Sequence, residues 1–145
     1  MPQLSKAEIL ERCNAFNANT LMETLHINYT DVGKDFLTAS MPVNARVYQP
    51  DGVLHGGAML ALAESVGSAA CFVFLDAENF NIRGIEMSAN HVKSMREGHV
   101  HATAKLLHKG RTTQVWNILL KNDEDQLISA AKLTTIALPK QNDNS

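Results

Sequence analysis

Several residue types that define particular protein classes are scarce in this sequence. Only two of the 145 residues are cysteines, which is too few for a disulfide framework and favours a reducing, cytoplasmic location. The net charge is −2, and without a basic surplus we expect no nucleic-acid partner. The first residues contain no long apolar segment of the kind that secretory signal peptides carry. Linkers, repeats and low-complexity tracts are also missing, so we expect a single domain over residues 1–145.

Hydrophobic residues make up 45% of the chain, and their spacing predicts a clear order of helices and strands. Ser5 and Glu8 indicate the capping box of a short helix, within an N-terminal helical extension over residues 1–20. Two strands, one long apolar helix and four more strands follow, and residues 139–145 are expected to form a frayed tail. The strands are expected at residues 26–33, 35–43, 81–93, 99–109, 112–122 and 126–138, and the helix at residues 54–75. This order predicts an α+β fold in which an antiparallel sheet wraps around a central helix, the arrangement called a hotdog.

The apolar helix has to be tested first as a membrane span. From Ala58 to Leu75 it has 18 residues, which is the lower limit for crossing a bilayer. Glu64 lies near its centre, where a charge costs about 2.5 to 3.5 kcal/mol on insertion scales. We therefore expect a buried helix and no membrane partner.

Glu64 is the only acidic or basic residue in this helix. An ionised carboxylate is expensive to bury unless it is paired or hydrogen-bonded. The positions one turn away are Leu60, Ala61, Gly67 and Ser68, so the helix itself offers no cation. Either an arginine from a strand pairs with the carboxylate, or the carboxylate takes part in a reaction.

The start of the helix favours a reaction. His55, Gly56 and Gly57 stand where the first backbone N–H groups are unpaired and carry partial positive charge. Such groups can stabilise a developing oxyanion. Gly56 and Glu64 are eight residues apart, or about 12 Å along a helix, so one carbonyl cannot reach both groups of one chain. Two such helices running antiparallel across a two-fold axis solve the problem, which predicts at least a homodimer.

The motif and its surroundings resemble those of a known family. The sequence contains LHGGAMLALAESVGS, with Gln49 and Pro50 before it and SANHVKSMREGHVHATAKLLHKGRTTQVWNILLKNDE after it. It resembles the hotdog acyl-CoA thioesterases of the aroyl-CoA branch, of the dihydroxynaphthoyl-CoA and enterobactin-proofreading type, from about Leu21 to Leu138. The resemblance implies a homodimer or homotetramer that uses neither cofactor nor metal. Asp51 departs from the family pattern, in which an apolar residue often follows the Gln-Pro pair. The identity of the acyl group in the substrate is therefore left open.

The resemblance also implies roles for single residues, matched by position. Glu64 attacks the thioester or activates water, and the N–H of Gly56 polarises the thioester carbonyl. The other matched positions lie around the carbonyl and the acyl pocket, and they are Gln49, His55, Ser68 and His91.

Each of these positions also has a purely structural interpretation. His55 can cap the helix, Gln49 can be an ordinary turn residue, and serines such as Ser68 often bond back to a carbonyl one turn earlier. His99 and His101 alternate on a strand, but no third metal ligand is evident. The GxSxG motif of serine hydrolases is absent.

A cationic segment lies between His91 and Arg111, where five basic residues accompany one acid, Glu97. A solvated face of a hairpin is the simplest interpretation. The resemblance adds another, because coenzyme A carries phosphates that cationic groups can bind. The candidates are Lys93, Arg96, Lys109 and Arg111, together with the N–H of Gly110 in the turn.

The sequence therefore predicts an enzyme that hydrolyses an acyl-CoA thioester, with an aromatic acyl group favoured by the resemblance. Two alternatives on the same fold are a non-catalytic sensor of acyl-CoA and a dehydratase or hydratase that acts on the acyl chain.

Overall fold

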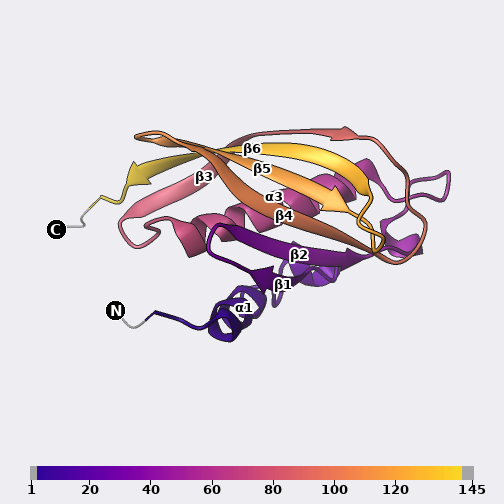
Figure 1. Cartoon of the computed structure of the whole chain (residues 1–145), viewed down its shortest axis with the longest axis horizontal. Helices are drawn as coiled ribbons and strands as arrows, with labels where there is room; N and C mark the ends of the chain where they lie inside the picture. Colours follow the sequence, from indigo (N-terminus) through magenta and orange to yellow (C-terminus); the bar gives the residue numbers. More distant parts are fainter. Residues whose placement is uncertain (1–2, 142–145) are drawn as a thin grey trace.

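One antiparallel sheet curves around a long helix in the computed structural model, which describes residues 3–141 (Figure 1). The sheet has six strands in the order β1-β2-β4-β5-β6-β3. The elements in chain order are α1 (Lys6–Ala15), α2 (Leu21–Thr24), β1 (Asn28–Val32), β2 (Phe36–Pro42), the 3₁₀ helix η1 (Ala45–Val47), α3 (Gly56–Phe74), β3 (Phe80–His91), β4 (His99–Lys109), β5 (Thr113–Lys121) and β6 (Leu127–Pro139). The predicted α+β hotdog fold is confirmed.

Helix α3 packs along one face of the sheet and contacts β2, β3, β4, β5 and β6. Its buried residues recur every three or four positions, as expected for one face of a helix, and they are Met59, Leu62, Ala63, Val66, Gly67, Ala70 and Cys71. In strand β5, buried and partly exposed residues alternate strictly. The buried residues are Gln114, Trp116, Ile118 and Leu120. At Gly67 the helix approaches the sheet so closely that a Cβ would lie 2.6 Å from Cδ2 of Leu133.

The length and composition of α3 alone would allow it to cross a membrane. In the fold, however, this helix buries its apolar face against the sheet. The core therefore accounts for the apolar residues on one face of this helix, whereas Phe72 on the other face is exposed.

Helix α1 begins with the predicted capping box, in which Ser5 and Glu8 bond to each other's backbone N–H groups. It packs beside β1, an edge strand of the sheet. The side chain of Asn14 bonds to both the N–H (2.7 Å) and the carbonyl oxygen (3.0 Å) of Tyr29. An amide side chain thus takes the place of a neighbouring strand, so this edge of the sheet is covered.

Strand β3 forms the other edge and is paired only with β6 within residues 3–141. A bulge interrupts its register between Gly84 and Glu86. Ile85 and Val92 are exposed here, at 57% and 59% of their surface. The sheet thus presents a long, partly apolar edge to its surroundings. At the other end of the chain, β6 runs to Pro139, and residues 142–145 of the predicted tail lie outside the described part of the chain.

Candidate active site

The first turn of α3 leaves one backbone donor free. His55 is the N-cap residue, and its Nδ1 accepts a hydrogen bond from the N–H of Gly57 at 2.7 Å. The N–H groups of Ala58 and Met59 both bond to the carbonyl oxygen of His55. Within residues 3–141, the N–H of Gly56 donates to no acceptor. The capping interpretation of His55 is confirmed, and the cap leaves the Gly56 amide available to a ligand.

Gly56 lies against the imidazole of His91, at the end of β3. A Cβ on Gly56 would lie 3.0 Å from both Cδ2 and Nε2 of that ring. Nδ1 of His91 lies 2.8 Å from Oγ of Ser129, a residue with no exposed surface on β6. The structure therefore brings His91 to the start of α3, although 35 residues separate it from Gly56 in the sequence.

Gln49 lies on a tight hairpin just before the helix. The N–H of Gly52 bonds to the carbonyl oxygen of Gln49 at 3.0 Å, and the N–H of Gln49 bonds to Val53 at 2.9 Å. Gly52 has φ +80°, which is typical of a type I turn followed by a left-handed residue. Pro50 suits the second position of this turn. The hairpin positions Gln49 ahead of the free amide, and its side chain is half-buried.

Glu64 is exposed in the single chain, so the expectation of a buried carboxylate is wrong for the isolated subunit. The reason is geometrical, because Glu64 lies on the face of α3 opposite Leu62 and Val66, which pack on the sheet. Its Oε1 lies 3.6 Å from the position of a Cβ on Gly84. No salt bridge joins Glu64 to a cation in residues 3–141, so the alternative of an arginine partner finds no support.

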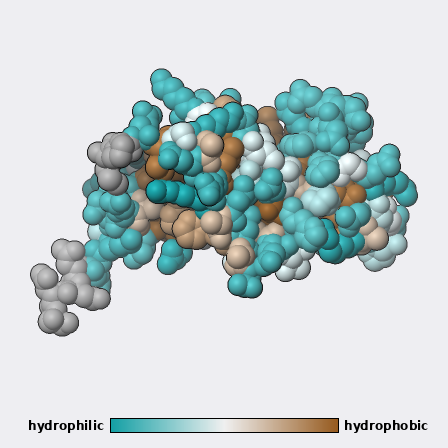
Figure 2. Space-filling view, turned by 90° about the horizontal axis from the view of Figure 1, so that it is seen from below, coloured by the Kyte–Doolittle hydropathy of each residue, from teal (hydrophilic) through white to brown (hydrophobic). Residues whose placement is uncertain are grey.

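Glu64 lines a cleft of about 1140 Å³ between α3 and the N-terminal helices. Most of the cleft wall is apolar, and its N-terminal side is formed by Ile9, Cys13, Phe16, Leu21 and Met22. Phe16 and Phe72 are exposed at 80% and 70% of their surface. Figure 2 shows hydrophobic surface between hydrophilic margins on the face seen from below. The wall of the cleft thus combines one acidic residue, Glu64, with a large apolar surface.

Ser68 lines the same cleft, one turn beyond Glu64. Its neighbour Ser65 bonds back to the carbonyl oxygen of Ala61 at 2.6 Å, as serines in helices often do. No such bond is found for Ser68 among the described residues, so its hydroxyl is not held by the helix backbone.

The cationic candidates are not brought together within one chain. Lys93 bonds to Gln126 at 2.8 Å, and Arg96 lies beside Gly52 in the loop before β4. Lys109 and Arg111 flank the turn at the opposite end of β4. At about 3.3 Å per residue, the length of β4 separates the two groups by roughly 30 Å. The N–H of Gly110 donates to the carbonyl oxygen of Thr113 at 2.7 Å, so it is already used within the turn.

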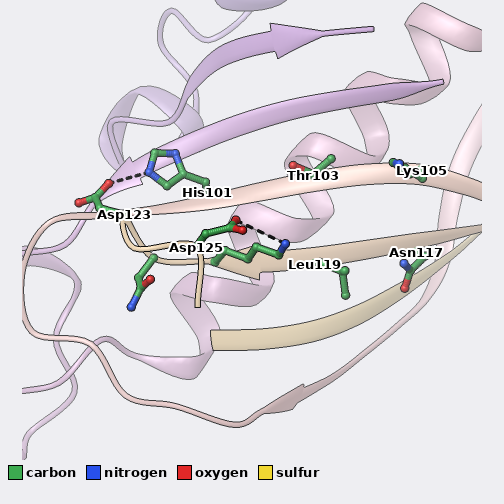
Figure 3. Close-up of a pocket in the computed structure, with 9 residues that line it drawn as sticks. His101, Thr103, Lys105, Asn117, Leu119, Asp123 and Asp125 are labelled. Atoms are coloured by element: carbon green, nitrogen blue, oxygen red, sulfur yellow. Dashed lines mark hydrogen bonds and ion pairs between the residues drawn. The ribbon is translucent and has the colours of Figure 1, made fainter. Parts of the chain in front are cut away.

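A second, smaller pocket of about 460 Å³ lies on the sheet face away from α3, and none of the candidate residues lines it (Figure 3). Nε2 of His101 bonds to Oδ1 of Asp123 at 2.7 Å, and Oδ2 accepts the N–H of His99 at 3.0 Å. These hydrogen bonds hold the pKa of Asp123 below its usual value, and the bond from His101 has the largest effect. No metal-binding cluster of His, Cys, Asp or Glu exists among residues 3–141. His101 thus serves to fix a turn.

Several residues at the site were not predicted from the sequence. Ile9, Cys13 and Phe16 recur along one face of α1 and line the cleft; their spacing of four and three residues was the available signal. Tyr29, whose pKa burial raises, donates from its hydroxyl to the carbonyl oxygen of Ser65. Ser129 had no signal, because only strand pairing places it opposite His91.

Comparison with known proteins identifies the chain as a thioester hydrolase. The model of the "Thioesterase superfamily" matches residues 51–129. The chain is 42% identical to the 1,4-dihydroxy-2-naphthoyl-CoA hydrolase of Escherichia coli over 129 residues, 89% of this chain and 94% of the relative. It is 39% identical to the proofreading thioesterase EntH of Cronobacter turicensis over 129 residues, 89% of this chain and 93% of that one.

Solved structures agree with the sequence matches. A mutant thioesterase from Pseudomonas aeruginosa superposes with a TM-score of 0.89 at 40% identity, covering 96% of this chain and 98% of that chain. The chain belongs to the thioesterase superfamily. The resemblance seen in the sequence is therefore confirmed.

Proposed function

We propose that this protein hydrolyses the thioester of an acyl-CoA, with Glu64 as nucleophile or general base and the partner subunit's Gly56 as oxyanion donor. One observation carries the proposal: among residues 3–141, a single helix presents an unbonded N–H at Gly56 and a carboxylate without a salt bridge at Glu64, and Glu64 lines an apolar cleft. The names of two relatives, a naphthoyl-CoA hydrolase and a proofreading thioesterase, support this reaction.

The chemistry needs both groups at one carbonyl. As the thioester carbon is attacked, negative charge develops on its oxygen, and a preorganised N–H stabilises that charge. Glu64 either attacks the carbon directly, forming an anhydride that water then opens, or removes a proton from the attacking water. In both routes the coenzyme A thiolate leaves and takes up a proton. The products are a carboxylic acid and free coenzyme A.

A homodimer brings the two groups together. The unpaired edge of β3 can pair with its own copy, because exposed sheet edges are templates for strand pairing, and a two-fold axis makes that pairing antiparallel. The His91 end of one β3 then lies beside the Phe80 end of the other. Gly56 adjoins His91 and Glu64 adjoins Gly84, so this pairing moves Gly56 of one subunit toward Glu64 of the other. A homotetramer forms if two such dimers associate.

Pairing of β3 also gathers the cationic residues. Lys93 and Arg96 follow the His91 end of the sheet, whereas Lys109 and Arg111 lie at the opposite end. In the paired sheet, Lys93 and Arg96 of one subunit lie at the same end as Lys109 and Arg111 of the other subunit. Coenzyme A phosphates bound there would use both subunits.

The cleft favours an aromatic acyl group. Its exposed phenylalanines, Phe16 and Phe72, can pack against a flat ring, and ring pairs gain about 0.5 to 1.5 kcal/mol beyond the buried area. Ser68 adds a polar group to the cleft wall, and His55 and Gln49 lie in the segment that leads to the Gly56 amide.

Release of free thiol from a panel of acyl-CoAs tests the function. Benzoyl-type, naphthoyl-type and straight-chain substrates are compared, and we expect turnover with aromatic groups to exceed that with straight chains. Tight binding without thiol release would indicate a sensor. A product that keeps its thioester but changes in mass by one water would indicate a dehydratase or hydratase, and either result would refute the proposal.

A further inference from the structure

The pair formed by His91 and Ser129 is specified by the sheet. His91 and Ser129 stand directly opposite each other in the antiparallel pairing of β3 with β6, so their side chains project from the same face. That face is the one covered by α3, because Ser129 has no exposed surface and His91 reaches Gly56 at the start of the helix. The pair thus connects the core to the proposed oxyanion donor.

The hydroxyl of Ser129 has two neighbours. Its Oγ lies 2.8 Å from Nδ1 of His91 and 3.2 Å from the carbonyl oxygen of Asn90. A hydroxyl has one hydrogen, and a carbonyl oxygen can only accept. Both bonds exist together only if Ser129 donates to Asn90 and accepts the hydrogen of Nδ1. Because Ser129 has no exposed surface, an arrangement that satisfies both of its bonds is preferred.

In a neutral ring, this arrangement determines what the other ring nitrogen can do. When Nδ1 of a neutral imidazole carries the hydrogen, Nε2 is an acceptor. Nε2 is the atom next to Gly56, and no hydrogen-bond partner for it is present in residues 3–141. An unprotonated Nε2 cannot donate to the thioester oxygen, so the Gly56 N–H carries that task. The unprotonated Nε2 can instead accept a hydrogen bond from an O–H group beside the carbonyl.

We propose that Ser129 is a positioning residue for the reaction: it holds the His91 ring with Nδ1–H directed inward and thereby sets Nε2 to accept a hydrogen bond from an O–H donor at the Gly56 end of the site. The donor is a water molecule or a hydroxyl on the acyl group. This inference rests on the proposed function for its kinetic consequence, whereas the state of the ring can be measured without any substrate.

Nitrogen NMR of the histidine rings tests the structural half. Two-bond proton–nitrogen spectra distinguish a protonated from an unprotonated ring nitrogen, and His91→Gln identifies the signals of His91. We expect Nδ1 protonated and Nε2 unprotonated in the wild type, and a mixture of tautomers in Ser129→Ala. A His91 ring with Nε2 protonated in the wild type would overturn the proposal.

Kinetics test the functional half. Ser129→Ala is expected to lower kcat/KM about 5- to 10-fold, the scale of one hydrogen bond, and Ser129→Cys, which keeps the shape but bonds weakly, should follow it. Ser129→Thr keeps the hydroxyl and should stay within about twofold of the wild type. If Ser129→Thr does not fold, the double variant decides: in a His91→Ala background, Ser129→Ala should have no further effect. A full additional loss there would show a purely structural role and refute the proposal.

The substrate separates the two sources of the O–H group. An equal cost of Ser129→Ala with benzoyl-CoA and 2-hydroxybenzoyl-CoA indicates water, and a larger cost with the hydroxylated substrate indicates the acyl hydroxyl. No cost with either substrate would refute the proposal. If the wild type cleaves no acyl-CoA at all, the proposed function fails, and the ring spectrum still decides the state of His91.

Discussion

Oε1 of Glu64 lies 3.6 Å from the point where a Cβ on Gly84 would stand. The carboxylate therefore rests against the edge strand β3. Since β3 is also the strand with an unpaired edge, Glu64 lies where a second subunit would meet the first.

Glu64→Gln should remove the reacting group while keeping its size. We expect kcat to fall by at least ~10²-fold, the scale of a lost general base, with binding of a non-hydrolysable acyl-CoA analogue nearly unchanged. Thiol release and calorimetric binding measure the two effects. Glu124→Gln, in the exposed β5–β6 turn, is the matched control, and undiminished turnover by Glu64→Gln would remove Glu64 from the mechanism.

Gly56→Pro should delete the backbone donor, and it also adds a Cβ about as close to His91 as alanine would. Proline is favoured at the first position of a helix, and His55 already has φ −66° and ψ 131°, which suits a residue before proline. We expect kcat to drop about 10²- to 10³-fold, as for loss of one oxyanion-hole donor. Gly56→Ala adds a Cβ near His91 but keeps the N–H, so it serves as the control. Equal activity of the two variants would argue against the amide.

Mixing the two inactive proteins tests the shared site. A dimer of Glu64→Ala with Gly56→Pro contains one site in which both groups are intact. After subunit exchange we expect up to about a quarter of wild-type activity, because about half of the dimers are mixed and each has one working site. Exchange is followed with differently tagged subunits. If mixed dimers form and stay inactive, both groups act within one subunit or one of them does not act.

Arg96→Gln and Lys109→Gln should weaken recognition of coenzyme A phosphates. We expect KM for acyl-CoA to rise about two- to tenfold, since each lost charge-assisted bond is partly screened by solvent. An acyl-pantetheine substrate lacks these phosphates, and its KM should not change. Lys132→Gln, an exposed change on β6, is the control. A KM that rises equally for both substrates would place these residues away from the phosphates.

Gly67→Ala should destabilise the protein, although alanine is the better helix former. The gain from helix propensity is about 1 kcal/mol, but the new Cβ would lie 2.6 Å from Leu133 and 3.1 Å from Ile118. Overpacking in a core costs about 1 to 3 kcal/mol, so we expect a lower urea midpoint. A higher midpoint would mean that α3 moves away from the sheet at little cost.

Asp123→Asn should reduce stability near neutral pH and flatten its acid dependence. The hydrogen bonds from His101 and His99 lower the pKa of Asp123 in the folded protein. A carboxyl of this kind stabilises the fold above its unfolded pKa, about 4, and the contribution is lost as the pH falls through the lower folded value. Urea midpoints at about pH 7 and about pH 3 should therefore differ less in the variant. An unchanged difference would mean that Asp123 adds nothing.

The sequence alone determined the order of elements and the hotdog fold. Alternating strands have period two and α3 has a one-sided apolar face, and these local periodicities are properties of neighbouring residues. The capping box of Ser5 and Glu8 and the cap at His55 could also be predicted, since both are contacts within one helical turn.

Tertiary structure decided which distant residues meet. The contact of His91 with Gly56, its bond to Ser129 and the position of Glu64 against Gly84 all depend on strand register and on the angle at which α3 crosses the sheet. Neither is encoded in a local pattern. The exposure of Glu64 has the same origin. Composition predicted a helix surrounded by apolar contacts, but one sheet covers only one face of a helix, and part of the other face lines the cleft.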